Sequence, residues 1–224
     1  MKAILFGATG MIGQAVLREL LLDPDVEGVL SVGRRATGQR QAKLTELVHG
    51  DFANFAPVEG RLAGFDACFF CLGVSSAGMS EADYRHVTYD YTLAAAETLA
   101  KQNPGMTFEY VSGTGTDSSE CSRTMWARVK GATENALLRL PFKAAYMFRP
   151  GYIQPMHGVR SATKWTRIGY AIAAPLYPVW KALFGRAITT SEELARAMIR
   201  VAKVGFRKPI VEAREIAEAA SGRS

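Results

Sequence analysis

Short apolar runs alternate along the chain with segments in which apolar residues recur every three or four positions. The run Lys2–Phe6 is followed by Met11–Leu22, where the apolar positions keep a helical period until Asp23-Pro24. Short apolar runs are typical of buried strands, and the longer period is typical of amphipathic helices. The chain therefore begins with a predicted strand and a predicted helix.

The same alternation continues toward the C-terminus and predicts an α/β fold. Ser191 is the expected N-cap of the Glu192–Val204 helix, because a hydroxyl there accepts a hydrogen bond from the first turn. Alternating strands and helices predict a Rossmann-type, doubly wound, mostly parallel sheet. The other predicted strands are Gly28–Val32, Leu44–His49, Phe65–Cys71, Thr107–Ser112, Ala144–Phe148 and Ile210-Val211, and the other predicted helices are Ser80–Gln102, Thr124–Leu140 and Glu212–Ala220.

The length of 224 residues predicts a single domain over residues 1–224. After Pro150 the alternation stops, and Gly151 to Gly185 carries Gly, Pro, Trp and Tyr without a strong period. We expect residues 151–190 to form a small C-terminal elaboration, a cap that covers the cofactor and shapes a substrate pocket.

A glycine-rich turn joins the first predicted strand to the first predicted helix. In the sequence Gly7-Ala8-Thr9-Gly10-Met11-Ile12-Gly13, the first glycine permits a tight turn and the last allows close packing of helix and strand. Gly10 lets the backbone approach a pyrophosphate, and the helix N-terminus supplies N–H donors to it. The segment Gly7–Gly13 therefore predicts dinucleotide binding.

Two arginines follow the second predicted strand. An NAD site would place an acidic residue here for the adenosine ribose, but the chain has Arg34 and Arg35, and no Asp or Glu between Glu27 and Glu46. Guanidinium groups pair with phosphates through several donors. The pattern favours NADP(H) over NAD(H), the alternative being that both arginines are solvated loop charges.

Several motifs resemble the extended and atypical short-chain dehydrogenase/reductase superfamily, especially the epimerase-like oxidoreductases related to the Tat-interacting protein family. The resemblance implies that Asp51 and Phe52 flank the adenine, that Leu72 and Gly73 line the cofactor, and that Pro150 belongs to the cofactor site. The motifs are Gly7–Gly13, His49-Gly50-Asp51-Phe52, Cys71-Leu72-Gly73, Tyr110-Val111-Ser112-Gly113, Lys130 and Arg149-Pro150-Gly151.

The resemblance also implies a catalytic set, from which the chain departs at one position. Members carry Tyr-x-x-x-Lys on one helix with an upstream Ser, here matched by Lys130 and Ser112. Trp126 occupies the tyrosine position, and an indole offers only an N–H of very weak acidity. Two hypotheses follow: a carbonyl or enone reductase with another proton donor, or a catalytically silent protein that senses NADP(H) or regulates a partner. Candidate donors are Ser112, Ser118, Ser119, Tyr89 and a water near Lys130.

The charge and the cysteine content narrow the classes of protein that this sequence fits. The net charge of +6 is dispersed, which does not indicate nucleic-acid binding, and the three histidines lack metal-ligand spacing. Cys68 and Cys71 are read as two buried apolar residues on opposite strand faces, and three cysteines favour a reducing, cytoplasmic setting.

No transmembrane segment is predicted. Residues 164–181 mix aromatic and basic side chains and fit a hydrophobic substrate pocket better than a membrane-surface or protein contact. Monomer and homodimer remain open.

Overall fold

The computed structural model describes residues 1–158 and 188–222. Its centre is a sheet of seven parallel strands in the order β3-β2-β1-β4-β5-β6-β9. The strands are β1 (Lys2–Phe6), β2 (Gly28–Gly33), β3 (Leu44–Val48), β4 (Ala67–Phe70), β5 (Thr107–Val111), β6 (Ala144–Arg149) and β9 (Ile210–Glu212). The strand order reverses beside β1, which is the doubly wound arrangement predicted from the alternating pattern.

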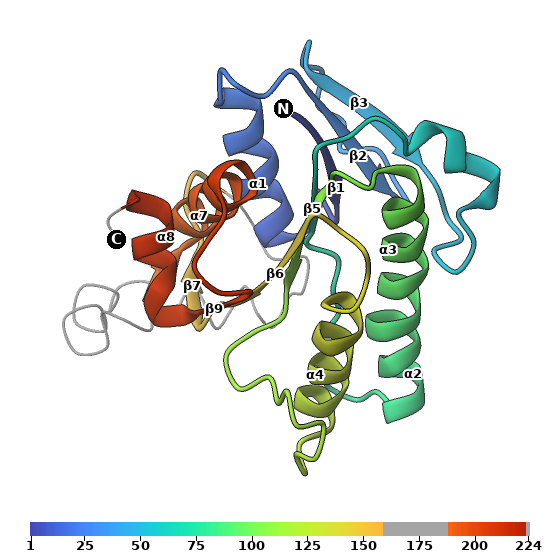
Figure 1. Cartoon of the computed structure of the whole chain (residues 1–224), viewed down its shortest axis with the longest axis vertical. Helices are drawn as coiled ribbons and strands as arrows, with labels where there is room; N and C mark the ends of the chain where they lie inside the picture. The colour runs from blue at the N-terminus through green and yellow to red at the C-terminus, as the bar shows by residue number, and fades with distance from the viewer. Residues whose placement is uncertain (159–187, 223–224) are drawn as a thin grey trace.

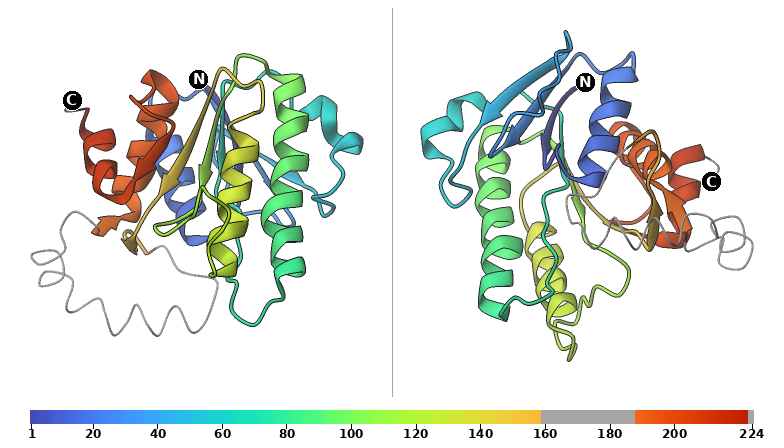
Figure 2. Two further views of the ribbon diagram at one scale, coloured as in Figure 1. Left: turned by 60° about the horizontal axis from the view of Figure 1, so that its bottom comes forward. Right: turned by 180° about the vertical axis from the view of Figure 1, so that it is seen from behind.

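Helices cover both faces of the sheet (Figure 1). One face carries α1 (Met11–Leu22), α7 (Ser191–Val204) and α8 (Ile216–Ser221), which lie together on one side in Figure 2 as well. The other face carries α4 (Met125–Leu137) and a long helix made of α2 (Glu81–Arg85), the π-helical turn η2 (His86–Asp90) and α3 (Tyr91–Gln102). Two short helical turns, η1 (Ala56–Arg61) and η4 (Ala213–Glu215), also form in these residues.

Two apolar cores form because every central strand is buried on both faces. Leu5 and Phe69 face the layer of α1 and α7, while Phe6 and Phe70 face the layer of α3 and α4. Strands buried on both sides read as continuous apolar runs, which is why the sequence located them. Parallel register brings the C-terminal ends of β2, β1, β4 and β5 to one edge.

Two local predictions need correction. Thr190, not Ser191, is the N-cap of α7, since its hydroxyl accepts the N–H of Glu193 at 3.0 Å. The Ser191 hydroxyl instead accepts the N–H of Met156, also at 3.0 Å. The predicted helix that begins at Glu212 starts as η4, with a capping box between Glu212 and Glu215.

A small parallel pair, β7 (Tyr152–Gln154) and β8 (Ile188–Thr190), was not predicted. Three-residue strands are too short to show a period. The pair lies within the 151–190 elaboration, most of which, including the aromatic and basic stretch 164–181, lies outside the described residues.

Candidate nucleotide-binding site

Gly7 and Gly13 are required by the packing of the turn that follows β1. Gly7 has a φ of +83°, and a Cβ there would lie 2.7 Å from the Cys71 carbonyl carbon. A Cβ on Gly13 would overlap the carbonyl of Gly7. Only glycine permits these approaches, so two of the three glycines hold β1, α1 and the end of β4 together.

The packing of the turn does not require glycine at position 10. The missing side chain there leaves room for a ligand. Its φ of −78° is ordinary, and a Cβ there would meet only the Gly7 carbonyl oxygen, at 3.3 Å. The first turn of α1 has no acidic residue, and no side chain in the described part of the protein caps it. A helix start without such a cap, with a bare backbone beside it, fits a pyrophosphate.

The rest of the turn divides between core and surface. Ala8 is buried in the core on the α1 side, and Met11 and Ile12 are half-buried against that core. Thr9 is exposed, and its carbonyl accepts a hydrogen bond from Gln14 at 2.8 Å. The turn therefore contributes backbone to the edge of the sheet, with little side-chain bulk above it.

The predicted adenosine residues follow the neighbouring strands. Arg34 and Arg35 are exposed directly after β2. Asp51 is exposed after β3, where one carboxylate oxygen accepts the N–H of Ala53 at 3.0 Å. Phe52, in contrast, is buried, with its ring 6.3 Å from the ring of Phe6. Phe52 thus packs in the core beneath this end of the site.

Leu72 and Gly73 follow β4, beside the glycine turn. Leu72 is half-buried against the core on the α3 side, and Gly73 is exposed, with no atom of the described residues within 4 Å of an added Cβ. The cysteines before them agree with the sequence interpretation: Cys68 and Cys71 pack on opposite faces of the sheet, and burial raises the pKa of both thiols.

Lys130 reaches the C-terminal end of β5 from α4. Its Nζ donates a hydrogen bond to the Ser112 carbonyl oxygen at 2.5 Å and lies 5.7 Å from the centre of the Tyr110 ring. Burial lowers the pKa of Lys130 to about 8, and the nearby Glu134 carboxylate opposes this shift. The ammonium is therefore held at the same edge of the sheet as the glycine turn.

Trp126 lies one helical turn before Lys130, on the same face of α4. Its ring packs on the loop after β5, because a Cβ added to Gly115 would lie 3.2 Å from the indole Cη2. Gly115 has a φ of +90°. The two side chains thus both lie against residues 112–115.

The Ser112 hydroxyl is buried and hydrogen-bonded inside the protein, so it is not exposed at the candidate site. It donates to Glu134 at 2.5 Å and lies 3.1 Å from the Phe148 carbonyl oxygen. Of the other candidate donors, the Ser119 hydroxyl donates to Asp117. The Ser118 hydroxyl accepts a hydrogen bond from Arg149, and the Tyr89 ring lies under the Arg85 guanidinium.

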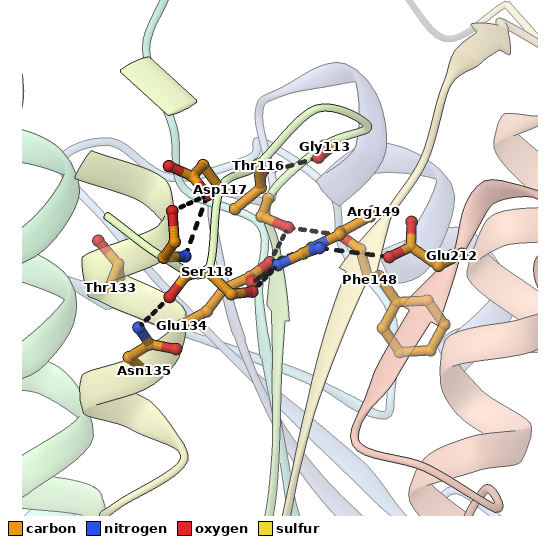
Figure 3. A network of polar contacts seen from close by, with 12 residues as sticks. Gly113, Thr116, Asp117, Ser118, Thr133, Glu134, Asn135, Phe148, Arg149 and Glu212 are labelled. Carbon is orange, nitrogen blue, oxygen red and sulfur yellow. Dashed lines mark hydrogen bonds and ion pairs between the residues drawn. The ribbon is translucent and has the colours of Figure 1, made fainter. Parts of the chain in front are cut away.

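A buried ion pair that the sequence analysis missed organises this corner (Figure 3). Arg149, at the end of β6, donates through Nε to both oxygens of Glu134, at 3.0 and 3.2 Å. It also donates to Glu212 at 3.2 Å and to Ser118 at 2.6 Å. The spacing of Glu134 one turn after Lys130, and the arginine that ends a strand, were the available signals. The network joins α4, β6, β9 and the loop after β5.

Two backbone contacts complete the corner. The Pro150 carbonyl accepts the N–H of Thr114 at 2.9 Å, so Pro150 braces the loop after β5. Gly131 permits α4 to touch that loop, because a Cβ there would overlap the Asp117 carbonyl. In residues 1–158 and 188–222, no group of three or more His, Cys, Asp or Glu side chains is arranged to hold a metal ion.

The match to a known family covers the glycine turn, the strand ends and α4. The NAD(P)H-binding family matches residues 7–134, more than half of the chain. This chain belongs to the NAD(P)H-binding family. The predicted membership of an NAD(P)H-binding, atypical and epimerase-like family is thereby confirmed.

Two relatives illustrate the range of similarity. Protein FMP52-1, mitochondrial, of Scheffersomyces stipitis is 26% identical over 97% of this chain and 98% of that protein. Protein HTATIP2 of Rattus norvegicus is 31% identical over 68% of this chain and 62% of that protein. The name of the fungal relative includes the word mitochondrial, which does not support the cytoplasmic location expected from the sequence. No helix among the described residues is both long and apolar enough to cross a membrane.

Solved structures share the fold. A dTDP-glucose 4,6-dehydratase from Streptomyces venezuelae, with NAD and TYD bound, aligns over 95% of this chain and 75% of its own, with a TM-score of 0.67 and 17% identity. This level of identity shows the Rossmann-type fold, which confirms the predicted fold class.

Proposed function

We propose that the chain is an NADP(H)-dependent reductase that delivers a hydride to the carbonyl or enone of a small hydrophobic molecule. The observation that carries the proposal is the Lys130 ammonium, held on the Ser112 carbonyl at the same sheet edge as the glycine turn. Gly7–Gly13 would hold the pyrophosphate, and Lys130 the nicotinamide ribose. Bound there, the cofactor supplies the hydride.

The preference for NADP(H) rests on Arg34 and Arg35. Both are exposed after β2, next to the end of β1, and they can form charge-assisted hydrogen bonds with a 2′-phosphate. Asp51, Phe52, Leu72 and Gly73 follow the flanking strands and would surround the adenosine and ribose groups, with Pro150 bracing the catalytic corner.

Calorimetric titration with NADPH and NADH tests this assignment. We expect tighter binding of NADPH, weakened about tenfold or more in Arg34→Ala or Arg35→Ala, which corresponds to about 1.4 kcal/mol. Arg139→Ala is the matched control, because Arg139 is exposed beyond the far end of α4. Equal binding of both nucleotides in every variant would contradict the NADP(H) preference, and no binding of either would remove the cofactor site.

Trp126 favours a second function, a protein that binds NADP(H) without turnover and regulates a partner. The indole packs on Gly115 where a general acid would stand. NADPH binding without oxidation of NADPH by any carbonyl, enone or quinone acceptor would select this second function.

A further inference from the structure

The corner formed by α4 and the end of β5 presents a cation and an indole side by side. Lys130 donates to the Ser112 carbonyl at 2.5 Å, and Trp126 packs its ring edge on Gly115. Because the two side chains are one helical turn apart, they face the same short segment, residues 112–115.

The hydroxyl groups around this corner are directed elsewhere. The Ser112 hydroxyl donates to Glu134, and the Thr114 hydroxyl donates to the Arg149 carbonyl at 3.1 Å. Tyr110 is buried, and burial raises its pKa. Compared with the Ser112, Thr114 and Tyr110 hydroxyls, the Lys130 ammonium is the better placed group to give a proton to a bound molecule.

Whether the Lys130 ammonium suffices as the proton donor depends on the chemistry of the molecule that accepts the hydride. Hydride addition to an aldehyde or simple ketone leaves an alkoxide, a strong base that needs a proton in the transition state. Hydride addition to a quinone leaves a hydroquinonate, whose charge is spread over an aromatic ring. A fixed positive charge beside the oxygen stabilises such an anion.

We propose, building on the reductase function above, that the substrate is a quinone, with Trp126 as the flat apolar wall and Lys130 beside the reduced oxygen. The hydride from NADPH would form an O–H bond with one quinone oxygen. The ring becomes aromatic, and the opposite oxygen is left as an anion. Lys130 gives that oxygen the second proton and recovers it from water, so the products are hydroquinone and NADP⁺.

The surroundings of Lys130 set the pH dependence of this step. Burial lowers the pKa of Lys130 to about 8, Glu134 on α4 opposes the shift, and the Tyr110 ring faces it from β5. Arg149 on β6 donates to the same Glu134 carboxylate. The ammonium is therefore populated at neutral pH and lost as the pH rises past about 8.

The test compares two acceptors with the full chain and NADPH. Tetramethyl-1,4-benzoquinone is the quinone, because its substituted ring blocks addition of the exposed Cys121 thiol, and benzaldehyde is the simple carbonyl. We expect turnover of the quinone, falling above about pH 8, and little turnover of benzaldehyde. Lys130→Met should lower quinone turnover at pH 7 at least about 100-fold and flatten the pH profile. Lys143→Met, the same change on an exposed lysine before β6, should leave both unchanged.

The pair Trp126→Tyr and Trp126→Phe isolates one hydroxyl group. Trp126→Tyr should gain benzaldehyde reduction over Trp126→Phe by about 100-fold, without a matching gain for the quinone. Calorimetry of the quinone with the NADP⁺-loaded protein should show binding that Trp126→Ala weakens.

Two results would overturn the inference, and they differ. Wild-type protein that reduces benzaldehyde as well as the quinone retains the reductase function but loses the quinone assignment. NADPH binding without turnover of either acceptor removes the reductase function itself.

Discussion

At the scale of single residues, the Glu134 carboxylate balances the positive charges of Arg149 and Lys130. It is fully buried, and it accepts hydrogen bonds from Arg149 and from the Ser112 hydroxyl. Two charges inside a protein are tolerated because each compensates the other, and removal of one leaves its partner buried and unpaired. Glu134 and Arg149 are therefore positioning residues for Lys130 and the loop after β5.

Glu134→Gln should show both consequences. We expect a loss of roughly 3–5 kcal/mol in the free energy of unfolding, since Glu212 is then the one ionic partner left to Arg149 among the described residues. The pKa of Lys130 should fall below about 8, because the carboxylate that raises it is gone. Urea unfolding and an NMR titration of the Lys130 side chain measure the two effects. Glu81→Gln, which breaks the exposed pair with Arg128, is the control and should change neither; an unchanged Lys130 pKa in Glu134→Gln would contradict the positioning role.

Residue identity was easier to predict here than side-chain direction. The sequence located Lys130, Ser112 and Trp126 at one corner because spacing along α4 and the end of β5 are local features. It could not foresee that Ser112 points toward Glu134, since that choice depends on Arg149 arriving from β6, a strand brought next to β5 only by the fold.

At the scale of elements, the three glycines of the first turn have separable roles. Gly10→Ala keeps an ordinary φ and needs a shift of only a few tenths of an ångström from the Gly7 carbonyl. It should therefore fold normally but bind NADPH about tenfold or more weakly, because the methyl group occupies the pyrophosphate position. Gly13→Ala should instead destabilise the fold by roughly 1–3 kcal/mol, the usual cost of overpacking.

Thermal unfolding of the apo protein and calorimetry with NADPH distinguish the two variants. Normal NADPH affinity in a well-folded Gly10→Ala would show that no phosphate approaches Gly10. The contrast between the two positions is more informative than either variant alone, since both replace glycine by alanine on the same turn.

Element boundaries were predictable where burial is complete and not where it is partial. The central strands are apolar on both faces and appeared with ends displaced by only one or two residues. The pair β7 and β8 has three residues per strand, and Thr190 and Ser191 offer two hydroxyls to one helix start. In such places the element boundary depends on hydrogen bonds to residues distant in the sequence. The Ser191 hydroxyl, for example, accepts the backbone N–H of Met156 and does not cap the helix.

At the scale of the whole molecule, one carboxyl group lies in the central sheet without a described partner. Glu109, in the middle of β5, is fully buried between Phe69 of β4 and Tyr146 of β6. Among the described residues neither of its oxygens has a hydrogen-bond partner, and burial raises its pKa well above 4.5. Burial therefore favours the neutral form of this carboxyl group at the centre of the fold.

This placement makes the stability of the molecule depend on pH. A carboxyl group whose pKa is raised by folding contributes fully below its ordinary pKa of 4.5, and the contribution is lost as the pH rises toward the folded-state value. Glu109→Met keeps a similar shape without the polar oxygens, so it should stabilise the fold at pH 7 by roughly 1–3 kcal/mol. Urea unfolding from pH 5 to pH 8 should show a decline in the wild type that the variant lacks. Glu97→Met, on the exposed face of α3, should retain the decline; an equal slope in Glu109→Met would place the titrating group elsewhere.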